Sequence, residues 1–482
     1  MNAKVVVTGA MFALFLAALE QTIVSTALPA IMADLGHVEL GSWVITAYLV
    51  SVVCATPALG KLSDLYGRAV VLRTCIALFV AGSMACAAAP SMPMLIAGRA
   101  VQGVGGGGLL VMAQTIVGDA VPPRERGRFA AWFSIVWTTA SLLGPLLGGL
   151  LAEHTGWRWI FWTNLPLGAL ATVLAERGLR ELAPTRRPAH VDVMGSVLLS
   201  IASVGVLMLA SRSRILSWDG GAAMVAVASA GSLLLFVRRQ RRVPEPIVPA
   251  DFLRDPVIAP VLVSTFLVYG SYLSLSVMLP LYFQLGLGRS SAESGSLLVP
   301  MMVMSSVTAF LAGRYTRTHG RYRPPPLATL PVAIVACVLL AIAAPHGSAW
   351  TMSALGALFA LGIGAIFPCT IVAAQAAAGR RHLGAISGAI TLVRALGASV
   401  ATGLLMAVLF HMIARGLPEA STLQSLEDLV RRPMDTHARS VVLSAFAVVA
   451  WIETALLTAG FLAFLRLEDV ELADAGWQDA AD

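Results

Sequence analysis

Long apolar runs alternate with short polar segments along almost the whole chain. A hydrocarbon core of roughly 30 Å requires about 20 apolar residues when they form a helix, and runs of about this length recur from end to end. The sixth and eighth runs are short, and no stretch between the runs predicts a sizeable soluble domain. The pattern predicts an all-α membrane protein with fourteen transmembrane helices, at 5–28, 42–62, 70–90, 93–117, 128–152, 159–176, 191–211, 221–238, 257–284, 293–314, 325–345, 350–378, 384–414 and 438–466.

Composition agrees with this interpretation. The chain is 57% hydrophobic and 12% charged, whereas soluble domains carry about 25% charged residues. The net charge of +7 does not predict nucleic-acid binding, because the basic residues form short clusters between apolar runs. Placing the N-terminus in the cytoplasm puts most Lys and Arg residues on that side, which predicts an even number of spans and two cytoplasmic termini. The five cysteines lack metal-ligand spacing, so we expect neither a metal nor a cofactor.

The sequence contains an internal repeat. The segment GKLSDLYGR begins at Gly60, and the related segment GRYTRTHGR begins at Gly313. The same shift of 313 − 60 = 253 residues places Gly144 on Gly397. Repeats of this kind are typical of secondary transporters, which bind substrate near the membrane midplane between the two repeats.

The repeat predicts how the chain is organised. Two six-helix halves at 1–180 and 251–482 account for the shift, with two additional helices between them at 181–250. The mechanism expected for such a protein is rocking of the two halves about a central cavity.

Four charged residues fall inside the predicted spans, where each costs several kcal/mol. Glu20 lies deep in the first span, and its carboxyl group either handles a proton or a substrate cation, or pairs with a distant arginine. Arg99, in the fourth span, does not usefully lose its proton. It either couples to a nearby acid or anchors the backbone together with Gln102, which shares its helix face.

The other two intramembrane charges, Arg394 and Glu453, also leave two interpretations open. Arg394 either lines a water-filled cavity or pairs with an acid. Glu453 either contacts a cationic substrate or lies in a packing interface away from the transport path. The candidates for the substrate cavity are therefore Glu20, Gln102, Arg394 and Glu453.

Two glycine-rich segments predict mechanical roles. In the fifth span, Pro145 removes a backbone donor and glycines admit a close neighbour, so we expect a hinge or seal formed by Gly144, Pro145, Gly148 and Gly149. The segment after the second span is expected to be a tight cytoplasmic loop containing Gly60, Asp64, Gly67 and Arg68. There Asp64 would meet a helix N-terminus or an arginine of the other half and act as a conformational latch.

These motifs resemble those of the major facilitator superfamily, and most closely the fourteen-helix drug:proton antiporters of the QacA and EmrB type. The resemblance covers essentially the whole chain and rests on LEQTIVSTALP (19–29), GKLSDLYGR (60–68), RAVQGVGGG (99–107), SLLGPLLGG (141–149) and WRWIFWTNLPLG (157–168). It implies that Arg99 belongs to a proton-coupling motif and that Gly144 and Pro145 belong to the antiporter motif.

The chain departs from that family's pattern at several positions. Glu20 stands where the family normally has Asp, which keeps the acid and lengthens its reach by one methylene. Leu65 and Ala69 replace charged residues of the loop motif, so the network around Asp64 is thinner. Ala140 replaces a glycine of the antiporter motif and still permits close packing.

The expected function is export of lipophilic, often cationic drugs across a bacterial cytoplasmic membrane, driven by protons. The expected partners are drugs, protons and the lipid bilayer, and a monomer is sufficient for the mechanism. The first alternative is an exporter of one antibiotic or metabolite on the same scaffold. The second is a membrane enzyme or receptor, which would require a cluster of His, Asp or Glu at one membrane face, and the sequence shows none.

Overall fold

The computed structural model describes residues 3–37, 40–179, 192–211, 220–417 and 436–472, and within these ranges every regular element is helical. The elements are α1 (Ala3–Leu35), α2 (Gly41–Tyr66), α3 (Arg68–Ala87), α4 (Met92–Ala120), α5 (Pro123–His154), α6 (Arg158–Trp162), α7 (Asn164–Leu179), α8 (Val193–Ser211), α9 (Gly220–Gln240), η2 (Ala250–Leu253), α10 (Ile258–Leu281), η3 (Tyr282–Gly286), α11 (Ser291–His319), α12 (Pro324–Ala343), α13 (Ala349–Ile363), α14 (Ile366–Ala378), η4 (Arg380–His382), α15 (Leu383–Gly416) and α17 (Thr436–Leu465).

Twelve spans among the described residues are long and apolar enough to cross a membrane. They match twelve of the fourteen expected spans; α10 with η3 forms one of them, and α13 with α14 forms another. The sixth and seventh expected spans are helical but shorter: α7 has 16 residues, and α8 has 19 with an apolar part at Val193–Leu209. The expected number of fourteen is therefore not confirmed.

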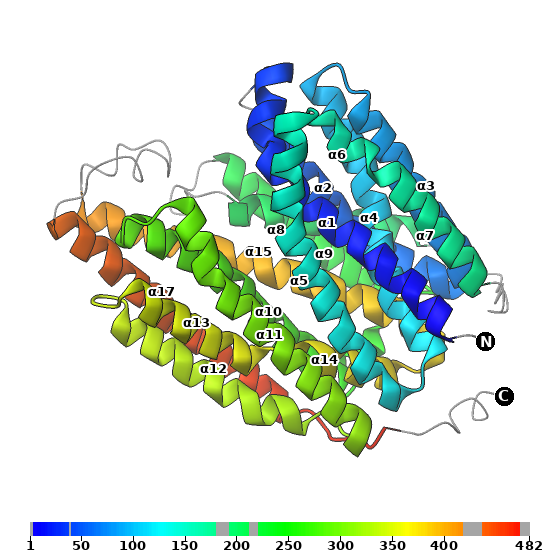
Figure 1. Ribbon diagram of the computed structural model, residues 1–482. Helices are drawn as coiled ribbons and strands as arrows, with labels where there is room; N and C mark the ends of the chain where they lie inside the picture. Colours follow the sequence, from blue (N-terminus) through cyan, green and yellow to red (C-terminus); the bar gives the residue numbers. More distant parts are fainter. Residues whose placement is uncertain (1–2, 38–39, 180–191, 212–219, 418–435, 473–482) are drawn as a thin grey trace.

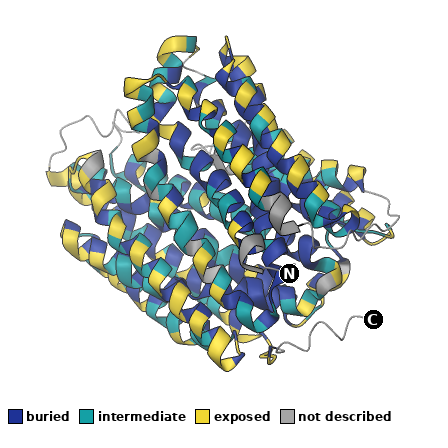
Figure 2. Ribbon diagram, turned by 45° about the vertical axis from the view of Figure 1, so that its right-hand side comes forward, coloured by how far each residue is buried: buried dark blue, intermediate teal, exposed yellow. Residues whose placement is uncertain are grey.

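The helices gather into two groups, α1–α7 and α10–α17, which lie side by side and diverge toward one end (Figure 1). Each group has its own buried apolar core, with buried residues inside and exposed ones outside (Figure 2). Many large apolar side chains are among the exposed residues. Such an apolar exterior is unfavourable in water and suits contact with lipid tails.

The additional helices α8 and α9 pack on each other, and α8 lies against α2 and α15. The side chain of Asp192, just before α8, ties the pair together. Its carboxylate accepts hydrogen bonds from Arg239 (2.6 Å) and Gln240 (2.7 Å) of α9. These charge-assisted bonds hold α8 and α9 together.

The structure also shows the sequence repeat. Helix α2 ends before Gly67 (φ 91°), and α11 ends before Gly320 (φ 66°), so both copies of the motif turn at a glycine with positive φ. Between α2 and α3 only Gly67 is outside the helices. The predicted cytoplasmic loop containing Asp64 and Arg68 is therefore wrong. Asp64 lies in the last turn of α2, and Arg68 is the first residue of α3.

Candidate proton and substrate sites

A buried polar cluster surrounds Glu20 inside the first half. The side chains of Glu20 and Arg99 are each 1% exposed, and Arg99 Nη1 donates to Glu20 Oε1 over 2.6 Å. Arg99 also donates to Gln102 Oε1 (2.7 Å) and to the Val44 carbonyl (3.0 Å), and its guanidinium lies 4.3 Å from the centre of the Tyr48 ring. The structure thus brings together Glu20 and Arg99, the two residues expected to act in proton coupling, and Gln102, a candidate for the substrate cavity.

Two further members of this cluster were missed from the sequence. Asn164, at the start of α7, donates to Glu20 Oε2 (2.7 Å) and to Ser83 Oγ of α3 (3.2 Å). Gln102 donates to the same Ser83 hydroxyl (2.7 Å). Asn164 lies in the segment WRWIFWTNLPLG, where an amide within an apolar run is the only available signal. Each oxygen of the Glu20 carboxylate therefore has a hydrogen-bond partner. Loss of its charge would weaken a network that links α1, α3, α4 and α7.

Glu453 is a buried acid of the second half, where α17 packs on α10. It is 0% exposed in α17, the sixth helix of that half, and both carboxyl oxygens lack a hydrogen-bond partner. The buried hydroxyls of Ser271 and Ser274, on α10, are its polar neighbours and also lack partners. In the first half, Glu20 and Asn164 lie where α1 packs on α7, and there the two side chains are hydrogen-bonded to each other. Contact of Glu453 with a substrate stays a prediction.

Arg394 of α15 lies among aromatic rings, with its guanidinium 5.7 Å from the centre of Tyr269 and 6.0 Å from the centre of Phe367. It donates to the Phe367 carbonyl (3.1 Å), and no carboxylate pairs with it among the described residues. Tyr272 packs edge-on against Phe367, with centroids 5.3 Å apart. These four side chains are partly exposed and come from α10, α14 and α15. Arg394 was identified as a candidate from the sequence, but none of the three aromatic residues around it was.

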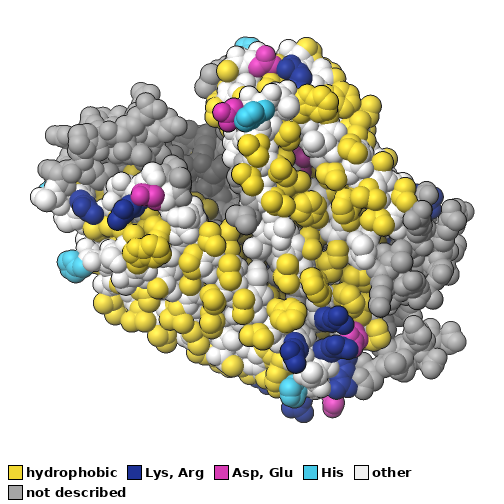
Figure 3. Space-filling model, in the orientation of Figure 1, with side chains coloured by type: hydrophobic (Ala, Val, Ile, Leu, Met, Phe, Trp, Pro, Cys, Tyr) yellow, Lys and Arg dark blue, Asp and Glu magenta, His cyan; other side chains and the backbone are white. Residues whose placement is uncertain are grey.

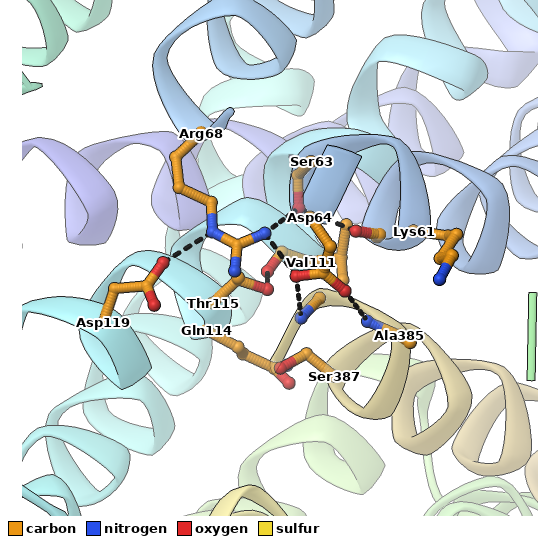
Figure 4. Close-up of polar contacts among 12 residues, drawn as sticks. Lys61, Ser63, Asp64, Arg68, Val111, Gln114, Thr115, Asp119, Ala385 and Ser387 are labelled. Atoms are coloured by element: carbon orange, nitrogen blue, oxygen red, sulfur yellow. Dashed lines mark hydrogen bonds and ion pairs between the residues drawn. The ribbon is translucent and has the colours of Figure 1, made fainter. Parts of the chain in front are cut away.

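Asp64 joins the two halves, as the latch hypothesis requires (Figure 4). Its two carboxylate oxygens accept hydrogen bonds from the backbone amides of Gly384 and Ala385, each over 2.9 Å, in the first turn of α15. The first amides of a helix have no partner within the helix, and they favour a negative charge. The α2 carboxylate therefore caps a helix of the other half.

Arg68 holds Asp64 in place. Its guanidinium lies between the carboxylates of Asp64 and Asp119, at 2.5 Å from each (Figure 4). Asp119, in the last turn of α4, was not singled out from the sequence. Nearby, Gly60 approaches Gly384 so closely that a Cβ on Gly60 would lie 2.4 Å from the Gly384 carbonyl oxygen. Glycine at position 60 thus permits the backbone contact that carries the latch.

The second copy of the motif makes the reciprocal contact. Arg317, which replaces the acid in the repeat, pairs with Glu125 in the first turn of α5 (2.7 Å). Arg124 of α5 donates to the carbonyls of Arg317 and Thr318, each over 2.9 Å. The two contacts are therefore equivalent: α2 of the first half meets the beginning of α15, and α11 of the second half meets the beginning of α5. We call this end of the molecule the latch end.

The glycines of the antiporter motif let α5 pack closely on α1. A Cβ on Gly144 would lie 2.0 Å from Thr22 Oγ1, and one on Gly148 would lie 2.2 Å from the carbonyl oxygen of Ile23. Gly149 has no atom within 4 Å of such a Cβ. Pro145 is part of α5, although its side chain is not among those described.

This geometry predicts different stabilities for two neighbouring substitutions. Gly148→Ala should lower the free energy of unfolding by about 1–3 kcal/mol, because the added methyl group forces α5 away from α1. Gly149→Ala, the matched control, should leave stability unchanged or raise it slightly. Thermal unfolding of the purified variants in detergent compares the two. Equal midpoints for both variants would contradict the close-packing account.

Comparisons with known proteins agree with this architecture. The model of the Major Facilitator Superfamily matches residues 10–402. The chain is 30% identical to the multidrug transporter protein MdtP of Bacillus subtilis over 84% of this chain and 74% of MdtP. It is 29% identical to multidrug resistance protein 3 of the same organism, over 87% of this chain and 82% of that protein. The crystal structure of the human organic anion transporter MFSD10 superimposes with a TM-score of 0.66 at 17% identity, covering 95% of this chain and all of that one.

Proposed function

Since this chain belongs to the major facilitator superfamily of membrane transporters, we propose that it exports lipophilic drugs in exchange for protons. Members of this family are transporters and not enzymes, and the relatives include named multidrug transporters. Two halves joined by polar contacts at the latch end support alternating access, in which these contacts break and re-form during each cycle.

The observation that carries the proton-coupled part is the fully buried Glu20–Arg99 pair. Protonation of Glu20 removes the charge to which Arg99 and Asn164 donate, and so loosens α1 from α4 and α7. Because α1 packs on α5 and α5 packs on α11, this change reaches the seam between the halves. We therefore assign Glu20 as the proton carrier and Arg99 as the residue that stabilises its charged form.

The aromatic cluster around Arg394 supports a lipophilic substrate. Tyr269 and Tyr272 of α10 pack edge-on against Phe367 of α14, and α14 contacts α5 of the first half. Flat aromatic molecules gain contact area and favourable ring geometry in such surroundings. We propose that this cluster forms one wall of the drug site, and that Gln102 reaches the drug only indirectly, through the Glu20 cluster.

A growth-inhibition panel tests the breadth of this function. A drug-sensitive bacterial host expressing the chain should resist several unrelated lipophilic compounds, including cations. Resistance to a single chemical class would instead identify a narrow-specificity exporter of one antibiotic or metabolite. Unchanged sensitivity to every compound, with the protein present in the membrane, would contradict export.

We further propose fourteen spans in the arrangement of the QacA and EmrB type, inserted in a bacterial cytoplasmic membrane with both termini inside. At 1.5 Å per residue, the 19 residues of α8 extend about 29 Å, and the 5 and 16 residues of α6 and α7 together extend about 32 Å. Both lengths suit a hydrocarbon core of roughly 30 Å.

A topology reporter distinguishes twelve spans from fourteen. If α7 and α8 both cross the membrane, a reporter inserted at residue 185 lies in the cytoplasm, on the same side as one inserted at residue 256. If neither crosses, the reporter at residue 185 lies outside. Fluorescent-protein and alkaline-phosphatase fusions at both positions make the comparison, and an external signal at residue 185 would rule out fourteen spans.

A further inference from the structure

A basic pocket lies between the two halves at the latch end, apart from the Glu20 and Arg394 clusters. Its volume is about 690 Å³. Helix α5 supplies Arg124, Glu125 and Arg128, and helix α11 supplies Arg314, Arg317 and Phe310. Four arginines therefore line the pocket, two from each half.

Two of these arginines have charges available for a ligand. Glu125, the acid of the pocket lining, is already paired with Arg317 over 2.7 Å. Arg128 and Arg314 are exposed, one from each half, and within the described part of the chain their guanidinium groups have no ion pair or hydrogen bond. A guanidinium presents a fork of donors that matches two oxygens of a phosphate group. The pocket therefore suits a phosphate that is held from both sides.

Apolar surface continues directly from this pocket. Phe310 lines it, and on the same helix Val307 and Leu311 are exposed. Trp132 is exposed one helical turn beyond Arg128 on α5. In the space-filling view the cluster of Lys and Arg side chains borders a wide hydrophobic surface (Figure 3). A ligand with an anionic head and an apolar chain would satisfy both surfaces at once.

We propose that this pocket binds the phosphate headgroup of an anionic phospholipid. The phosphate lies between Arg128 and Arg314, and one acyl chain follows the apolar face of α11 past Phe310 and Val307. Basic pockets between transmembrane helices at the membrane surface favour such headgroups. Free inorganic phosphate shares the headgroup chemistry but gains nothing from the apolar surface. This inference uses only the pocket, and it holds whether or not the chain exports drugs with protons.

Native mass spectrometry of the delipidated full chain tests the proposal. Phosphatidylglycerol should bind the wild type at least tenfold more tightly than phosphatidylcholine. Arg128→Gln and Arg314→Gln should each weaken that binding about fivefold, and the double variant by more than tenfold. The double variant R238Q/R241Q removes two exposed arginines, one in the last turn of α9 and one directly after it, and serves as the matched control. It should bind phosphatidylglycerol like the wild type.

Several outcomes would overturn the proposal. Equal binding of phosphatidylglycerol by the wild type and the Arg128/Arg314 double variant would remove the pocket from the interaction. Equal loss in the R238Q/R241Q control would indicate a general charge effect. If inorganic phosphate displaces phosphatidylglycerol at equal concentration, the pocket is a free-anion site and the apolar contact is wrong. Thermal unfolding of each variant without lipid confirms that the comparison is between folded proteins.

Discussion

Replacing Glu20 by Gln is expected to abolish drug accumulation against a gradient in energised membrane vesicles. One uncompensated proton moving through 100 mV supplies about 2.3 kcal/mol, which supports roughly a 50-fold gradient. Glutamine has the shape of the protonated acid but releases no proton. The variant should therefore let the drug equilibrate, with an accumulation ratio near one, while the wild type pumps.

The buried Arg99 requires a folding control for this experiment. Removing one partner of a buried ion pair can cost about 3–5 kcal/mol. In Glu20→Gln, however, Arg99 keeps its hydrogen bonds to Gln102 and to the Val44 carbonyl. Glu20→Asp retains an ionisable group, one methylene shorter, and should retain part of the active transport. Thermal unfolding and downhill exchange of drug identify folded variants.

If the folded Glu20→Gln variant still concentrates the drug to the wild-type level, the assignment of Glu20 as the proton carrier is wrong. The ion pair with Arg99 would then be structural.

Replacing Asp64 by Asn is expected to slow transport about tenfold and to loosen the first turn of α15. Hydrogen bonds to a charged acceptor contribute about 1.5–3 kcal/mol each, and Asp64 accepts two from α15. Arg68 keeps Asp119 as a partner, so the first half should stay folded. Hydrogen exchange of the Gly384 and Ala385 amides should accelerate by one to two orders of magnitude, since these amides lose their charged cap.

Asp34→Asn provides the matched comparison for the latch. Asp34 also forms an ion pair, with Arg158 over 2.6 Å, but within one half, and both side chains are 40% or more exposed. Exposed pairs contribute about 0–1 kcal/mol, so this variant should transport like the wild type. If Asp64→Asn leaves amide exchange in α15 unchanged, the contact between the halves is not a latch.

The sequence predicted the helices well because membrane spans have a strong local signal. Apolar runs of the required length recur, and the twelve spans among the described residues match expected runs. The repeat also predicted that Gly67 and Gly320 occupy equivalent turns. The lengths of α7 and α8 were harder to predict, because caps and neighbouring helices set where a helix ends, and single-sequence hydropathy contains neither.

The candidate sites were predicted in part, for a physical reason. A charge inside an apolar span is costly, so Glu20, Arg99, Arg394 and Glu453 were visible one by one. Their partners were not visible, because Ser83, Asn164 and Tyr269 are inexpensive in a membrane helix. Asp64 was assigned to a loop because charge usually indicates solvent. The structure buries it, since Arg68 and two backbone amides compensate its charge.

The central claim is that a proton gradient drives drug export by this chain, and flux in proteoliposomes tests it most directly. The purified protein is reconstituted, a pH gradient is imposed, and accumulation of a fluorescent drug is followed with and without a protonophore. The account predicts accumulation that requires the gradient, collapses with the protonophore and is accompanied by proton movement in the opposite direction. Equal accumulation with and without the gradient would contradict proton coupling.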